Sequence, residues 1–92
     1  ALADRAISEM PPYDLYIFES PSEAVIRFIR EGDNWHNGSI VFVGNLRGSA
    51  AGYRQWRHIC RLPEVRVVLE TYRAGLLFFR REQARQHFRI RT

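Results

Sequence analysis

The chain has 92 residues, one cysteine, fourteen basic residues that are all arginine, and a formal net charge of +4. So short a chain builds one domain with a modest core, and a single cysteine excludes an internal disulfide. No apolar run approaches the ~18 residues needed to span a membrane, so we expect no membrane partner.

The chain divides into a polar N-terminal lead, residues 1–12, and a single α/β domain, residues 13–92. The lead ends in Met-Pro-Pro, and consecutive prolines break any helix. The domain opens with YDLYIFE, residues 13–19, in which apolar side chains fall on both faces of an extended chain. This pattern predicts a strand that is covered on both sides.

The clearest helix pattern follows, over residues 20–32. Ser20 is placed to cap the helix, Pro21 takes the first helical position, and Glu23 completes a capping box. Apolar residues recur behind them at helical spacing, and Gly32 provides a C-terminal stop.

The remaining segments predict a strand, a helix and then two strands. SIVFVGN, residues 39–45, has a continuous apolar run that is typical of a central strand. Residues 49–62 have the apolar spacing of a helix, and residues 65–72 and 76–82 predict two strands joined as a hairpin. Residues 83–88 fit either a short last helix or an extended chain.

The order β-α-β-α-β-β, with an optional last helix, predicts a small α/β domain with a four-stranded mixed sheet and helices packed on it. Two successive strand–helix–strand units imply parallel pairing, and the hairpin adds an antiparallel edge. We expect Phe28 and Phe42 in the core, where either residue contributes roughly 3–5 kcal/mol.

Two resemblances bear on this order. VFVGNL, residues 41–46, resembles the first-strand hexamer of the RNA-recognition motif family, in which the residue matching Phe42 stacks on a base. The later stretch AGLLFFRR departs from that family's second motif, because Leu76 stands where an aromatic residue is expected. The order also resembles a thioredoxin-like core, but the C-x-x-C motif is missing, so no redox chemistry is implied.

Catalytic and metal-binding patterns are not found in the sequence. His36, His58 and His87 are scattered, with no pair at metal-ligand spacing on one predicted element. Cys60 is interpreted as a small buried apolar residue on a helix. We therefore expect no enzymatic activity, no metal, no cofactor and no small-molecule substrate.

Arginines supply the candidate site. Residues 47–92 carry eleven arginines against three acids, whereas residues 1–46 carry three arginines against seven acids. This asymmetry favours a one-sided positive surface, although the two halves can equally neutralise each other. Three of the arginines recur on one face of the helix predicted over residues 49–62, and no acid lies between Arg47 and Arg61.

We predict an anion- or nucleic-acid-binding surface built from the loop before that helix, the helix itself and the basic C-terminal region. Its residues are Arg47, Gly48, Ser49, Arg54, Arg57, Arg61, Arg80, Arg81 and Arg85. Guanidinium groups suit phosphate, and free amides at a helix start attract anions. The glycines of the loop can instead serve only to turn the chain. The first functional hypothesis is a small module that binds the phosphate backbone of nucleic acids.

The alternative hypothesis is a protein-interaction module, a homodimer with no nucleic-acid role. A four-stranded sheet has an exposed edge, which a two-fold twin can cover, and the acidic half of one chain can pair with the basic half of another. The single cysteine fits a reducing compartment, and the N-terminus has no basic start followed by an apolar stretch. We therefore expect a cytoplasmic location.

Overall fold

The computed structural model describes residues 14–90, so the predicted lead over residues 1–12 lies outside the described part. The described elements are β1 (Asp14–Phe18), α1 (Glu23–Glu31), β2 (Ser39–Val43), α2 (Ala50–Cys60), β3 (Val67–Glu70), β4 (Gly75–Phe78) and β5 (Gln86–Arg89). The predicted α/β class is confirmed, and so is the order of the first six elements. None of the helices in this part has the length and apolar character to cross a bilayer.

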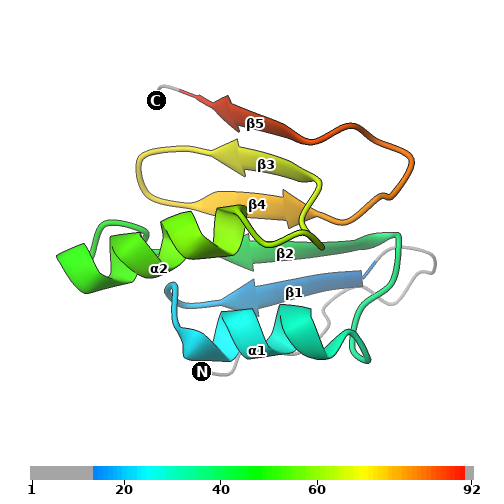
Figure 1. Ribbon diagram of the computed structural model, residues 1–92. Helices are drawn as coiled ribbons and strands as arrows, with labels where there is room; N and C mark the ends of the chain where they lie inside the picture. Colours follow the sequence, from blue (N-terminus) through cyan, green and yellow to red (C-terminus); the bar gives the residue numbers. More distant parts are fainter. Residues whose placement is uncertain (1–13, 91–92) are drawn as a thin grey trace.

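The strands form one mixed sheet in the order β1-β2-β4-β3-β5. β1 pairs in parallel with β2, and β3 pairs in parallel with β5, whereas β4 is antiparallel to both of its neighbours. Both helices lie on the same face of this sheet (Figure 1). One side of the sheet therefore carries the helices, and among the described residues no helix covers the other side.

Two details of the predicted sheet are wrong. The sheet has five strands, not four, because residues 86–89 stay extended and pair with β3, and the hairpin is not an antiparallel edge, because β4 lies between β2 and β3. The first error has a physical reason: all four residues of β5 are exposed, so no apolar pattern marks it as a strand. The second error arises because β4 has Leu77 buried on one face and two half-buried residues on the other, which suits a central strand.

The helix boundaries depart slightly from the predicted ones. α1 begins at Glu23 with Ser22 as its N-cap, not Ser20, and the Ser22 carbonyl accepts hydrogen bonds from the amides of Val25 and Ile26. The predicted stop at Gly32 is confirmed, because this residue has a φ of 74°, in the left-handed region that glycine adopts readily.

The core lies between the sheet and the two helices. α1 contributes Val25 and Ile29, and α2 contributes Trp56 and Ile59, all essentially inaccessible to solvent. Phe28 is half-buried at the margin of this core, where it packs against Tyr16 and Phe18 with ring centroids 5.0 and 5.4 Å away. The described elements therefore share one core.

The expectation that Phe42 lies in the core is wrong. Val41 and Val43 face the helices, and Phe42, which lies between them, faces the other side of the sheet. Phe42 is in register with Ile17 on one side and Leu76 on the other. The open face, as we call this side, carries the half-buried residues Leu15, Ile17, Ile40, Phe42, Leu69, Leu76 and Phe78 together with exposed Phe88. β1 is therefore covered by helices on one side only.

Candidate anion-binding pocket

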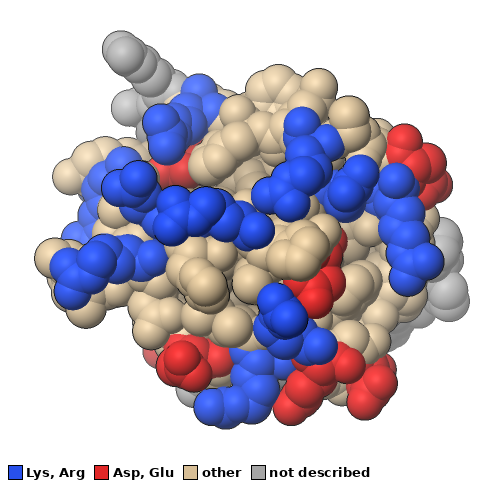
Figure 2. Space-filling view, viewed as in Figure 1, with Lys and Arg blue, Asp and Glu red and all other residues tan. Residues whose placement is uncertain are grey.

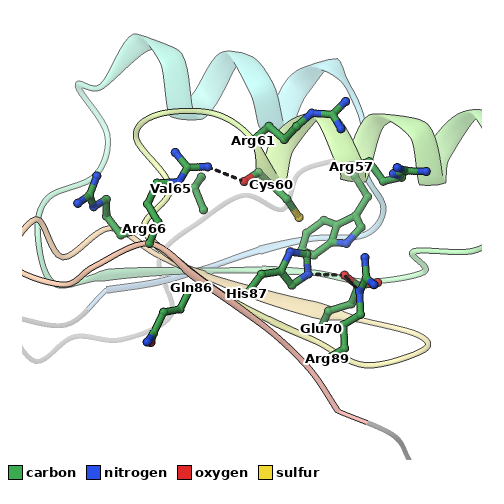
Figure 3. A pocket seen from close by; sticks show the side chains of 11 residues that line it. Arg57, Cys60, Arg61, Val65, Arg66, Glu70, Gln86, His87 and Arg89 are labelled. Carbon is green, nitrogen blue, oxygen red and sulfur yellow. Dashed lines mark hydrogen bonds and ion pairs between the residues drawn. The ribbon is translucent and has the colours of Figure 1, made fainter.

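A pocket of about 370 Å³ opens between the C-terminal half of α2 and the strands β3 and β5. Its lining includes five arginines and a single acid, Glu70. The arginines are Arg57, Arg61, Arg66, Arg85 and Arg89, and we call the site they line the arginine pocket (Figure 3). Arginine side chains also form a band across the upper half of the same face of the molecule (Figure 2).

The α2 side of the pocket follows from helical periodicity. Arg57 and Arg61 are four residues apart, so both lie on one face of the helix, whereas Trp56 points inward and is 1% exposed. Ser49 caps the start of α2, with its hydroxyl oxygen accepting a hydrogen bond from the Gly52 amide.

The strand side of the pocket depends on the pairing of β5 with β3. His87 is in register with Val68, and Arg89 is in register with Glu70. Paired residues point to the same face of a sheet, so this register brings His87 and Arg89 to the buried Glu70 on the helix side. The amides of Gln86 and Ile90 hold the strand in place by donating to the carbonyls of Arg66 and Glu70.

Glu70 is a buried carboxylate, 3% exposed, with partners on both oxygens. Oε1 lies 2.8 Å from His87 Nε2 and 3.8 Å from Arg89 Nε. Oε2 accepts a hydrogen bond from the Tyr53 hydroxyl at 2.9 Å and lies 3.7 Å from an Arg47 nitrogen. The carboxylate is therefore neutralised within the fold.

The partners of Glu70 determine its ionisation. Burial by itself raises the pKa of this carboxyl, but interactions with the Trp56 indole, His87 and Tyr53 outweigh burial and hold the pKa below its ordinary value. The Trp56 indole N–H lowers the pKa of the Glu70 carboxyl, although its geometry falls short of a hydrogen bond. Burial and the hydrogen bond to Glu70 raise the pKa of Tyr53. Glu70 is thus charged, and Tyr53 protonated, at neutral pH.

Cys60 Sγ, a Glu70 oxygen and a His87 ring nitrogen lie within 4.8 Å of one another. Thiolate, carboxylate and imidazole are ligands that zinc accepts. Among the described residues, these three side chains are therefore the group whose chemistry could hold a metal ion. Its surroundings oppose a cation, however, because five arginines line the pocket and Glu70 is already neutralised. Burial also raises the pKa of the Cys60 thiol to about 12, so the thiol is protonated and is a poor nucleophile. The chemistry favours an anionic ligand.

The structure brings together only part of the predicted site. Arg57, Arg61 and Arg85 line the arginine pocket, and Arg85 also donates to the carbonyls of Cys60 and Leu62, both at 3.4 Å. Arg54 lies exposed on α2 and does not line the pocket. Arg80 borders a separate pocket beside the open face, and Arg81 lies near Trp35.

The loop before α2 uses its polar groups within the fold. Arg47 lies between the rings of Tyr53 and Tyr72, at 4.4 and 4.5 Å from their centroids, and donates to the Tyr72 carbonyl at 2.9 Å. The Gly48 amide donates to the Asn45 carbonyl, and a side chain at Gly48 would collide with the side chain of Asn45. The loop acts as a tight connection, and Ser49 is occupied as the helix cap.

Two lining arginines, Arg66 and Arg89, were not among the predicted site residues. Arg89 becomes recognisable once residues 86–89 are read as a strand, because alternation then puts it on the same face as His87. Arg66 precedes β3 and donates from Nε to the Gln83 carbonyl at 3.2 Å, a contact for which the sequence has no signal.

No family model, curated protein or solved structure matches the chain.

Proposed function

We propose that this domain binds the phosphate backbone of nucleic acids through the arginine pocket. One observation carries the proposal: five arginines surround a pocket whose single acid is already neutralised by its own neighbours. Guanidinium groups bind phosphate oxygens through paired, charge-assisted hydrogen bonds. The free Cys60 fits a cytoplasmic setting for this binding, because thiols stay reduced there.

Donors in the pocket remain available for a ligand. Among the described residues, no ion pair or hydrogen bond engages the guanidinium groups of Arg57 and Arg61. Arg66 uses one nitrogen on a carbonyl and retains further N–H donors. Phosphate contacts of this kind carry little sequence information, so we expect binding to be largely independent of base sequence.

Replacing both helix arginines, Arg57→Gln with Arg61→Gln, should weaken oligonucleotide binding uniformly across sequences. It should also flatten the slope of log affinity against log salt by roughly 1.4–1.8, the value for two lost phosphate contacts. The measurement is fluorescence anisotropy of a labelled oligonucleotide, titrated at several salt concentrations.

The matched control is Arg27→Gln with Arg30→Gln, which removes the same charge from α1. Both arginine side chains are largely exposed: Arg27 lies 4.0 Å from exposed Glu23, and Arg30 lies 3.6 Å from half-buried Glu64. Ion pairs with an exposed cation contribute little to stability. If the control weakens binding as much as the pocket variant does, only net charge matters and the pocket has no special role.

A second candidate function, self-association, is favoured by the open face. Within residues 14–90 this apolar side of the sheet has no helix over it, and Phe88 at its margin is 46% exposed. Contiguous exposed apolar surface marks interaction sites, and a second copy of the same face can cover it by two-fold symmetry. The interface would then be the sheet face, not the strand edge expected from the sequence.

Phe88→Glu should raise the dissociation constant of such a dimer at least about tenfold, which corresponds to ~1.4 kcal/mol. Sedimentation velocity over a concentration series measures the effect, with Ala51→Glu on the exposed surface of α2 as the control. A wild-type chain that stays monomeric at the highest concentration excludes this function.

A further inference from the structure

Tyr72 is the most exposed large hydrophobic residue among those described, with 64% of its surface accessible. It lies in the turn between β3 and β4, two residues after Glu70. A single exposed ring is not unusual in itself, but a ring that is also held in place offers a flat surface on which a planar ligand can stack.

The ring is fixed from one side. The Arg47 guanidinium lies 4.5 Å from the Tyr72 ring centroid and donates to the Tyr72 carbonyl at 2.9 Å. The Arg47 guanidinium also lies 4.4 Å from the Tyr53 ring centroid, and the Leu46 amide donates to the Arg73 carbonyl at 2.9 Å, which ties the turn to the loop before α2. A ring held in this way loses little conformational entropy when a ligand stacks on it.

Arg47 also places Tyr72 beside the arginine pocket. The same guanidinium that contacts the Tyr72 ring lies 3.7 Å from Oε2 of Glu70, and Glu70 lines the pocket together with Arg89. The exposed ring and the cationic pocket are thus linked by one residue, with the ring just beyond the Glu70 end of the pocket.

We propose that Tyr72 stacks on a base of a single-stranded nucleic acid whose phosphates occupy the arginine pocket. This inference rests on the proposed function and names its ligand class. A positive groove with an adjoining aromatic ring is the arrangement that binds single strands without sequence preference. The bases of a duplex are already stacked on one another, so the domain should prefer single strands to duplex.

The test compares one labelled DNA sequence as a single strand and as a duplex, against wild type and three Tyr72 variants. Tyr72→Ala should weaken single-strand binding roughly 5- to 150-fold, the range for losing one base–aromatic stack, and leave duplex binding unchanged. Tyr72→Phe keeps the ring and should bind single strands like wild type. Tyr72→Leu keeps apolar bulk over Arg47 but has no ring, so it should behave like Tyr72→Ala.

The outcomes separate this inference from the function on which it rests. If wild type binds duplex as tightly as single strand, or if Tyr72→Ala weakens both equally, phosphate binding stands and base stacking is wrong. Full binding by Tyr72→Leu would show that Tyr72 only covers Arg47 and would overturn the stacking role. Failure of wild type to bind either form would overturn the proposed function along with the inference.

Discussion

Trp56→Ala should lower the free energy of unfolding by about 3–5 kcal/mol, the typical cost of removing a large aromatic side chain from a core. Trp56 is 1% exposed and is the largest fully buried side chain among the described residues. Its indole ring packs against the sheet at Gly75, where an added Cβ atom would collide with the outer edge of the ring. Chemical denaturation measures the loss, and wild-type stability in the variant would contradict this packing.

The contact with Gly75 makes the prediction sharper. Gly75→Ala alone should cost about 1–3 kcal/mol, because the added methyl overpacks the space that the indole fills. In the Trp56→Ala background the same change should cost far less, since the obstructing ring is gone. Residues in contact show such non-additivity, so a double-mutant cycle tests the packing directly. If the free-energy costs of the two substitutions are additive, the two residues are not in contact and the packing described above is wrong.

Glu70→Gln should lower the free energy of unfolding by roughly 2–4 kcal/mol, because it removes one charge from a buried network and leaves its partners poorly paired. His87 loses its carboxylate hydrogen-bond partner, and Arg47 and Arg89 lose their anionic neighbour. Glu23→Gln is the matched control: that side chain is 72% exposed and, within residues 14–90, forms an ion pair with Arg27 alone, so we expect a loss of about 0.5 kcal/mol or less.

The same carboxylate predicts how stability depends on pH. The pKa of Glu70 in the folded state lies below the ordinary value of 4.5, which approximates the unfolded chain. Its contribution to stability is therefore complete above about pH 4.5 and is lost as pH falls through the folded pKa. The stability difference between wild type and Glu70→Gln should accordingly shrink as pH falls below that value. A difference that stays constant, or grows, would contradict the lowered pKa.

Local signals predicted the helices and the α2 side of the pocket. Gly32 carries a stop signal that acts within a few residues, and the i, i+4 spacing of Arg57 and Arg61 fixes their common face whatever surrounds the helix. The capping box at Ser20 was wrong by two residues, an error expected where several polar residues compete to start a helix.

The strand side of the pocket was beyond prediction from local pattern. β5 has four exposed residues, so it is held by backbone pairing with β3 and carries no apolar alternation. That pairing brings His87 to Glu70 across seventeen positions of the chain, and Cys60 joins them from the end of α2. The open face was missed for a similar reason: Phe42 lies in a continuous apolar run, and such a run does not show which of its two faces a helix covers.

Amide chemical-shift mapping with a single-stranded oligonucleotide tests most directly whether the arginine pocket is the binding surface. We expect the largest shifts at residues 57–61 of α2, at His87 and Arg89 on the helix side of β5, and at Tyr72 in the turn after β3. Residues of the open face, such as Phe42 and Leu76, should be unaffected. Shifts centred on the open face, or no shifts at low salt, would contradict phosphate binding by the arginine pocket.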